Sequence, residues 1–247
     1  IMYKNFTLAF IPARGGSKGL KNKNITNLNK IPLIKYTLDF IKKKNPKLLV
    51  NDYIISTDSM KILNLLKKLK IKNDYIRPKK FSGDRANIVD TVIHGVNWYE
   101  NKNKIKVDNI ILLQPTSPIR NLHGVNKAIN FFIRNKIKTL FSAIKLDQSP
   151  YEILDIKDKS LRNNIVSRWN YLKKPKQHMK RRQDYKKNFV AIDGSFYIVN
   201  FNFLKKYKKF ICKKNSHIYI TNSKFKIDIN TISDIKITEA LIEKKLI

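Results

Sequence analysis

A basic, glycine-rich stretch near the start of the chain has the composition of an anion-binding loop. The sequence FIPARGGSKGLKNKNI, residues 10–25, follows an apolar run and sets cationic side chains among glycines. A turn of this kind exposes backbone N–H groups, and the cations add charge, so the stretch suits a polyanion such as a nucleoside triphosphate. Neither the Walker spacing G-x-x-x-x-G-K-[ST] nor the dinucleotide fingerprint G-x-G-x-x-G occurs here. The candidate phosphate ligands are Arg14, Lys18 and Lys23, set around Gly15, Gly16, Ser17 and Gly19.

The elements that must position this loop are short apolar runs that alternate with helical periodicity. This alternation predicts an α/β fold with a mostly parallel sheet and helices on both faces. Ligands of such sheets bind beyond the carboxyl ends of the strands, so the loops that follow strands are the candidate site. Strands are predicted at 6–11, 53–56, 109–113 and 139–144, and helices at 34–41, 62–69, 89–96 and, more weakly, after residue 124.

The pattern changes between about residues 147 and 188. This stretch is polar, dotted with aromatic residues and poorly periodic, so it is not expected to form a sheet layer. We interpret it as an excursion, either a lid or an arm for a partner subunit, from a single domain that covers residues 1–247. Strands are predicted again at 194–199, 218–220 and 225–229, and a closing helix at about 233–245.

Composition narrows the function classes. The formal net charge of +34 invites a nucleic-acid interpretation, but the lysines are spread over almost every predicted element and greatly outnumber the arginines that favour base-edge reading. We therefore expect no specific nucleic-acid partner. No uncharged apolar run is long enough for a membrane span, and the N-terminus does not resemble a signal peptide. A single cysteine, Cys212, fits a reducing cytoplasm.

Four further segments carry a resemblance to a known family. They are ISTDS at 55–59, Arg77-Pro78, FSGDRANIVD at 81–90 and LLQPTSPIR at 112–120. Together with the glycine loop they resemble the acylneuraminate cytidylyltransferases, which include the synthetases of CMP-sialic acid and CMP-legionaminic acid, from residue 8 to the end of the chain. The resemblance implies a Rossmann-like, GT-A-like nucleotidyltransferase sheet, transfer of CMP from CTP to a nine-carbon 2-keto-3-deoxy sugar acid with release of pyrophosphate, and a role in surface glycan (lipopolysaccharide) biosynthesis. Kdo cytidylyltransferases share that fold and are the second choice, because their first loop reads differently.

The resemblance also implies roles for individual residues. Arg14 and Lys18 would hold the triphosphate with help from Lys23. Cytosine would be read by Asn24, Arg77 and the backbone near Ala86, since an amide and a guanidinium supply paired donors and acceptors.

The sugar acid would meet a second group of residues. Gln114 would hydrogen-bond it from the QPTSP turn, although Gln114 and Thr116 would also fit a capped turn before a helix. Arg182, in the Arg182-Gln183 pair, would bind the sugar carboxylate, or would be one more cation of a basic arm. The family lends this arm to a neighbouring site, so we expect a homodimer.

The metal site departs from the family pattern. Relatives end their sheet with Asp-x-Asp-Thr and bind Mg²⁺ through both carboxylates, whereas residues 227–231 read Ile-Asp-Ile-Asn-Thr. Alternation along a strand would put Asp228 and Asn230 on one face, and an amide oxygen can still bind a hard cation. Asp234 would either compensate or cap the last helix. A catalytically idle relative therefore stays open.

Two other positions bear on the chemistry. Asp193-Gly194-Ser195 stands where relatives have Asn-Gly-Ala, so Asp193 would accept from a sugar hydroxyl or sit in a turn. No histidine falls in a matched segment, so no histidine base is assigned. The proximity of the metal would acidify the attacking hydroxyl.

Overall fold

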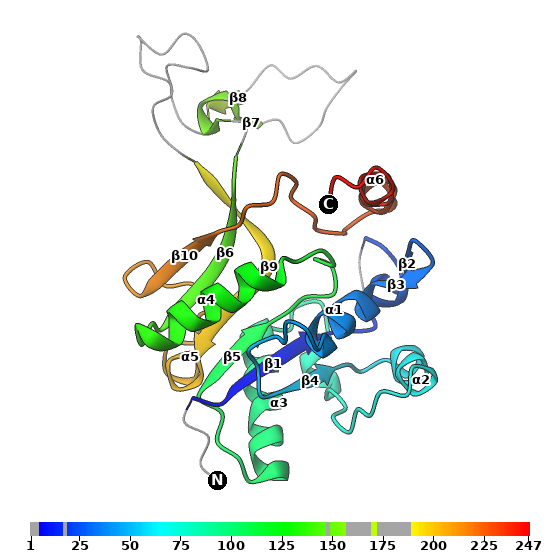
Figure 1. Ribbon diagram of the computed structural model, residues 1–247, viewed down its shortest axis with the longest axis vertical. Helices are drawn as coiled ribbons and strands as arrows, with labels where there is room; N and C mark the ends of the chain where they lie inside the picture. Colours follow the sequence, from blue (N-terminus) through cyan, green and yellow to red (C-terminus); the bar gives the residue numbers. More distant parts are fainter. Residues whose placement is uncertain (1–4, 17–18, 147–148, 157–168, 172–188) are drawn as a thin grey trace. The chain divides into compact units, whose positions relative to one another are not determined.

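The computed structural model describes residues 5–16, 19–146, 149–156, 169–171 and 189–247. The chain divides into two compact units, one made of Ile1–Ala143 and Ile192–Ile247 and the other of Ile144–Ala191. The first unit carries a six-stranded sheet (Figure 1), in the order β10-β6-β9-β5-β1-β4. Its strands are β1 (Thr7–Pro12), β4 (Asp52–Ser56), β5 (Asn109–Leu112), β6 (Thr139–Lys145), β9 (Val190–Asn200) and β10 (Ser216–Ile220).

The pairing confirms a mostly parallel sheet. Strand β1 pairs in parallel with β4 on one side and β5 on the other, with Ala9 opposite Tyr53 and Ile111. Strand β10 is parallel to β6, whereas β9 runs antiparallel to β5. Because β1, β4 and β5 point the same way, the segments that follow them meet at one edge of the sheet.

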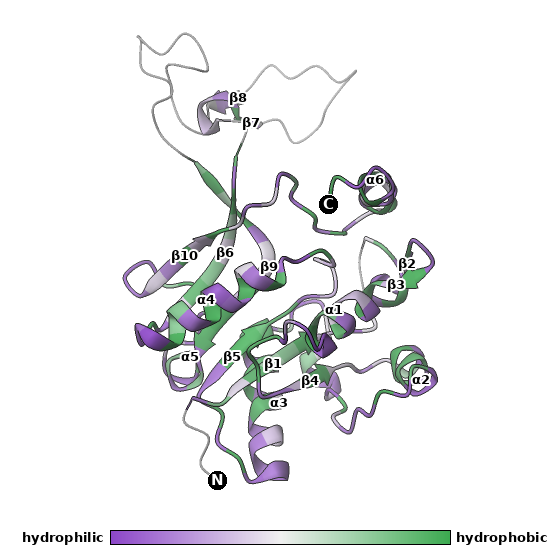
Figure 2. Cartoon of the chain, in the orientation of Figure 1, coloured by the Kyte–Doolittle hydropathy of each residue, from purple (hydrophilic) through white to green (hydrophobic). Residues whose placement is uncertain are grey.

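Helices cover both faces, as the alternation along β1 requires. Ala9 and Ile11 pack with α1 (Leu33–Lys42), α2 (Met60–Lys68) and α4 (Leu122–Arg134). Leu8 and Phe10 face the other way and pack with α3 (Ile88–Asn103) and α5 (Phe201–Tyr207). Strands β1, β5 and β6 are buried along almost their whole length and are mostly hydrophobic in Figure 2, as strands covered on both faces are. All four strands and four helices predicted before residue 145 are confirmed.

The prediction of a strand at 225–229 is wrong, because no regular strand forms there. The backbone N–H of Ile229 donates to the Thr116 carbonyl at 2.8 Å, and Ile229 is fully buried. The apolar residues Ile227 and Ile229 of this segment pack instead into a small cluster with Leu28, Leu33 and Ile235. The segment is thus held by side-chain burial and one tie to the QPTSP turn, without a neighbouring strand that could complete a ladder.

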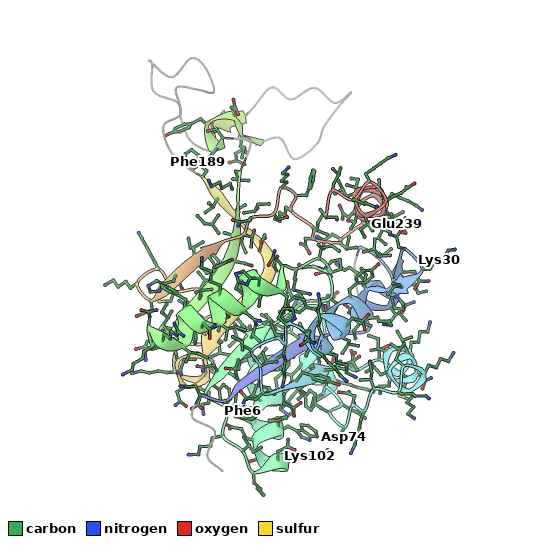
Figure 3. The ribbon with its side chains drawn as sticks, in the orientation of Figure 1. Phe6, Lys30, Asp74, Lys102, Phe189 and Glu239 are labelled. Atoms are coloured by element: carbon green, nitrogen blue, oxygen red, sulfur yellow. The ribbon has the colours of Figure 1, made fainter. Side chains whose placement is uncertain are left out.

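The closing helix α6 (Ile232–Glu243) begins directly after this segment and packs on a small hairpin of β2 (Asn27–Leu28) and β3 (Ile31–Pro32). Glu239 of α6 accepts a hydrogen bond from the backbone N–H of Asn29 at 3.0 Å. Figure 3 shows Glu239 on α6 and Lys30 on the hairpin. Leu28 of the hairpin and Ile235 of α6 pack with Ile229, so the hairpin and the helix together hold residues 227–231 near Gly19 of the glycine loop.

Short 3-10 helices complete the description at Lys23–Ile25, Lys79–Phe81 and Pro150–Glu152. In the second unit, β7 (Leu154–Ile156) and β8 (Trp169–Tyr171) pair antiparallel as a sheet of their own. Most of the predicted excursion at 147–188, including Arg182 and Gln183, lies outside the described residues. None of the helices described is long and apolar enough to cross a membrane.

Candidate active site

A cavity of about 630 Å³ opens at the carboxyl edge of the parallel strands, where the segments following β1 and β5 meet the loop between α2 and α3 and residues 228–231. Three cations and, among the described lining residues, one carboxylate face it, so its walls attract a polyanion. It brings together ten residues that the sequence singled out: Arg14, Gly19, Lys23, Asn24, Arg77, Ala86, Gln114, Thr116, Asp228 and Asn230.

Arg14 and Lys23 are both engaged with neighbours across the cavity. The Arg14 guanidinium donates to Asp84 Oδ1 at 3.0 Å and to the Gly83 carbonyl at 3.2 Å. Lys23 Nζ donates to Asn230 Oδ1 at 2.9 Å. Both cations are partly exposed, and such pairs are weak in water, so a triphosphate can displace these partners.

Asn24 and Arg77 are buried at the inner end of the cavity. Asn24 Nδ2 donates to the Arg14 carbonyl at 2.9 Å, which fixes the start of the glycine loop. The Arg77 guanidinium donates from Nε to Ser56 Oγ at 2.9 Å and from Nη2 to the Ser56 carbonyl at 2.7 Å. Burial lowers the Arg77 pKa, and the charge of Asp58 opposes that shift. The Ala86 N–H closes a turn onto the Gly83 carbonyl at 3.0 Å.

The glycines contribute differently from the prediction. The Gly15 N–H donates to Asp58 Oδ1 at 2.8 Å, so it is engaged by the loop after β4, and neither Gly15 nor Gly16 lines the cavity. Gly19 does line it, and a Cβ there would lie 2.9 Å from the Asn230 carbonyl oxygen, so that close backbone approach requires glycine. Ser17 and Lys18 lie outside the described residues.

Gln114 and Thr116 belong to a turn that Arg120 holds rigid. Arg120 Nη2 donates to the Gln114 carbonyl, Nη1 to Thr37 Oγ1 at 3.0 Å and Nε to the Ser195 carbonyl at 2.7 Å. Complete burial lowers the Arg120 pKa to about 9, opposed by the charge of Asp193, so the guanidinium remains protonated at neutral pH. Arg120 ends the LLQPTSPIR segment, but the sequence did not predict that its guanidinium holds the QPTSP turn through these hydrogen bonds.

Asp193 is a structural residue in this cluster. Its Oδ1 accepts from Ser142 Oγ and from the Ser195 N–H at 3.0 Å, and its Oδ2 accepts from Thr221 Oγ1 at 3.0 Å. The carboxylate is buried, and these bonds offset the cost of that burial. The suggestion that Asp193 accepts from a sugar hydroxyl is therefore not supported, and the turn interpretation fits.

Asp228 and Asn230 both line the cavity and contact each other, although no strand holds them. Asn230 Nδ2 donates to Asp228 Oδ2 at 3.0 Å, while its Oδ1 faces Lys23. No cluster of three acidic, histidine or cysteine side chains that could hold a metal occurs in the part of the chain described. One carboxylate and one amide oxygen still fit Mg²⁺, because Mg²⁺ takes one or two carboxylates and completes its shell with substrate phosphates and water.

The decisive observation is a match along the chain. The family model described as Cytidylyltransferase matches residues 8–247. The chain belongs to the cytidylyltransferase family. A pseudaminic acid cytidylyltransferase of Campylobacter jejuni is 28% identical over 234 residues, 95% of each chain. A CMP-N,N'-diacetyllegionaminic acid synthase of Legionella pneumophila is 26% identical over 238 residues, 96% of each.

The fold is the Rossmann-like fold of nucleotidyltransferases. The solved structure of a CMP:2-keto-3-deoxy-manno-octonic acid synthetase complexed with CTP matches with a TM-score of 0.66 over 98% of this chain and 100% of that chain. The two are 13% identical, so this likeness concerns the fold alone.

Some lining residues of this cytidylyltransferase cavity were missed from the sequence. Phe81, Gly83, Ile88 and Thr91 come from the loop after Pro78 and from the first turn of α3. They lie in or directly after the FSGDRANIVD segment, so this motif indicated the right region of the chain. The motif did not indicate which of its residues line the cavity. Periodicity assigns a core face, and a loop has no period.

Asp234 takes part in the capping box that begins α6. Its Oδ2 accepts from the N–H groups of Asn230 and Thr231, at 2.8 and 2.7 Å, and Thr231 Oγ1 accepts from the Asp234 N–H at 3.2 Å, which makes a capping box. Partial burial would raise the Asp234 pKa, but these hydrogen bonds outweigh it and lower the pKa.

We expect Asp234→Ala to lower the free energy of unfolding by about 1 kcal/mol, because α6 loses the Asp234 half of its capping box while Thr231 remains the N-cap. Since the folded-state pKa is lowered, this contribution is present above about pH 4 and is lost as the pH falls further. Urea unfolding at pH 7 and pH 3 measures both effects. A large loss of Mg²⁺ dependence with unchanged stability would instead make Asp234 a ligand.

Proposed function

We propose that the chain transfers CMP from CTP to a nine-carbon, nonulosonic sugar acid and releases pyrophosphate. The observation that carries this proposal is the single cavity that joins the cations Arg14, Lys23 and Arg77 to Gln114 and Asp228. Support also comes from the full-length relatives whose names specify pseudaminic and diacetyllegionaminic acids. The sugar-acid class rests on those names together with the QPTSP turn.

The proposed reaction is an in-line displacement at the α-phosphorus. The anomeric hydroxyl oxygen of the sugar acid forms a bond to this phosphorus, and the bond from it to the oxygen that bridges to the β-phosphorus breaks. The bridging oxygen leaves with pyrophosphate, and the hydroxyl proton passes to water. Phosphoryl transfer asks a protein mainly for positioning and charge neutralisation, which this cavity supplies. No histidine is among the described lining residues.

Binding of CTP uses the residues at the inner end of the cavity. Arg14 and Lys23 neutralise the triphosphate once they leave Asp84 and Asn230. Because Asn24 Nδ2 is held by the Arg14 carbonyl, its Oδ1 is the atom that accepts from the cytosine amino group. Arg77 Nη1 makes no hydrogen bond among the described residues and donates to the cytosine carbonyl.

A Mg²⁺ ion is part of the proposal. Asp228 and the amide oxygen of Asn230 would hold it together with the triphosphate. When bound, such an ion polarises the phosphoryl oxygens and lowers the pKa of a nearby hydroxyl. The chain's own contribution is to keep Asp228 at the cavity wall, through the tie between Ile229 and Thr116.

Release of pyrophosphate from CTP tests the proposed function. Pseudaminic, legionaminic and N-acetylneuraminic acids are each supplied with Mg²⁺, with UTP in place of CTP as the nucleotide control and Kdo as the sugar control. Turnover with one nine-carbon acid and CTP is expected. Turnover with Kdo alone would move the substrate to the eight-carbon class, and no turnover with any acid would indicate a catalytically idle relative.

We also propose a homodimer, because the excursion at 147–188 resembles the arm that relatives lend to a neighbouring subunit. The chain mass is 29.1 kDa, so light scattering at micromolar concentration is expected to give twice that value. Deletion of residues 157–188 with a short glycine linker is expected to give the monomer mass. A full-length monomer would contradict the proposal.

A further inference from the structure

The Ser117 hydroxyl is buried without a hydrogen-bond partner. Its side chain is 0% exposed, and its Oγ is the one buried side-chain oxygen or nitrogen in the described part of the chain that makes no hydrogen bond. The Ser117 backbone, in contrast, is held, because its N–H donates to the Gln114 carbonyl at 3.1 Å. A buried hydroxyl of this kind destabilises a fold, so its presence calls for an explanation in function.

Gly194 shows which group lies nearest to this hydroxyl. It has φ +78°, which favours glycine, and a Cβ built there would lie 3.2 Å from Ser117 Oγ and 3.7 Å from Gln114 Oε1. Ser117 Oγ and Gln114 Oε1 therefore flank the same small space over the Gly194 α-carbon. A larger residue at 194 would fill it.

The backbone of Gln114 is held in place, but no hydrogen bond among the described residues holds its side chain. Arg120 and the Ser117 N–H both hold the Gln114 carbonyl, whereas the Gln114 carboxamide makes no hydrogen bond among the described residues, and Gln114 is one of the residues that line the cavity. Ser117 does not line the cavity, so its hydroxyl acts on a ligand only through a neighbour. The Gln114 carboxamide is that neighbour.

We propose that Ser117 is a positioning residue for Gln114: its hydroxyl donates to Gln114 Oε1 when the sugar acid is bound, and this turns Gln114 Nε2 toward an oxygen of the sugar acid. The inference rests on the proposed function. A hydroxyl donating to Oε1 leaves the amide nitrogen as the group presented to the ligand, which suits a carboxylate or hydroxyl oxygen and rejects a donor. Ser117 thus sets the polarity of the sugar site without touching the sugar.

Thermal unfolding without substrate tests the first half of the inference. Ser142 is the matched control, because it is also 0% exposed but is fully engaged, accepting from the Phe196 N–H at 3.0 Å and donating to Asp193. Ser142→Ala is expected to lower the melting temperature by roughly 5 °C, since it leaves buried partners unsatisfied. Ser117→Ala is expected to leave it unchanged or raise it slightly. A fall equal to that of Ser142→Ala would show that the hydroxyl has a structural partner and would overturn the inference.

Kinetics with the best nine-carbon acid of the panel tests the second half. Ser117→Ala is expected to raise the KM for the sugar acid about fivefold to tenfold, the equivalent of one neutral hydrogen bond, with the KM for CTP unchanged. In a Gln114→Ala background the same change is expected to have no further effect, because its action passes through Gln114. Additive effects, or an equal rise in the KM for CTP, would overturn the inference. Wild-type inactivity with every acid would reject the proposed function instead, while the thermal comparison still decides whether Ser117 is unsatisfied.

Discussion

Asp228→Asn is expected to reduce turnover about a thousandfold while leaving the fold intact. Asp228 is the one carboxylate among the described residues that line the cavity, so its loss leaves Mg²⁺ with neutral protein ligands and the substrate phosphates. A metal that neutralises developing charge contributes several kcal/mol, and each 1.36 kcal/mol corresponds to a factor of ten in rate. Initial rates at saturating CTP and sugar acid measure the loss, and melting temperature controls for folding.

The paired change Asn230→Asp is expected to act in the opposite direction. Asn230 Nδ2 now donates to Asp228 Oδ2 at 3.0 Å, so an aspartate places a second carboxylate where there is a donor, and the two repel each other unless a cation lies between them. Lys23, 2.9 Å from the Asn230 Oδ1, offsets part of this charge. We therefore expect a severalfold lower Mg²⁺ concentration at half-saturation.

Two measurements decide the metal proposal. Mg²⁺ titration of the initial rate compares the three proteins, and calorimetric Mg²⁺ binding without CTP gives a readout that does not depend on activity. Identical Mg²⁺ affinity in wild type and Asn230→Asp would mean that residue 230 does not contact the ion. The ligands would then have to be sought elsewhere, with Asp58 the next candidate because Asp234 is committed to its helix cap.

Arg14→Ala is expected to reduce turnover at least about a hundredfold, because the triphosphate loses a charge-assisted hydrogen-bond donor with the planar fork that a lysine lacks. Arg14→Lys keeps the charge but loses the planar guanidinium fork, so its turnover is expected to lie between those of wild type and Arg14→Ala. Steady-state rates of pyrophosphate release, with the KM for CTP, measure both variants. Activity of Arg14→Ala within a few-fold of wild type would remove the glycine loop from the nucleotide site.

The contact between Arg14 and Asp84 supplies the matched control. The pair is half exposed, with side-chain exposures of 32% and 49%, and such pairs contribute about 0.2–1 kcal/mol. CTP must displace Arg14 from Asp84, so Asp84→Asn is expected to lower the KM for CTP by no more than a few-fold. A rise in this KM would mean that Asp84 helps to hold CTP and does not compete with it.

The sequence by itself determined the layers of the fold and the place of the site. Leu8, Ala9, Phe10 and Ile11 are all apolar. Because successive side chains of a strand point to opposite faces, this continuous apolar run, followed by helical spacing, indicates a sheet that is buried on both faces. The basic glycine loop and the QPTSP turn each follow a strand, so parallel strands bring them to one edge, and Arg77 reaches that edge from the loop after α2. These features depend on local periodicity and on chain direction, both of which the order of residues encodes.

The tertiary structure alone decided what the polar side chains do. The sequence left Asp193 open as a sugar ligand or a turn residue, and Asp234 as a metal ligand or a helix cap. In the structure, Asp193 is enclosed by Ser142, Ser195 and Thr221, and Asp234 belongs to the capping box of α6. The apolar alternation at 225–229 had the period of a strand, but it found no neighbouring strand to pair with and packed through its side chains. The role of a carboxylate or hydroxyl depends on which donors approach it from distant parts of the chain. Ser117 shows the same dependence, because only its three-dimensional surroundings reveal a hydroxyl that is buried beside Gln114 and lacks a partner.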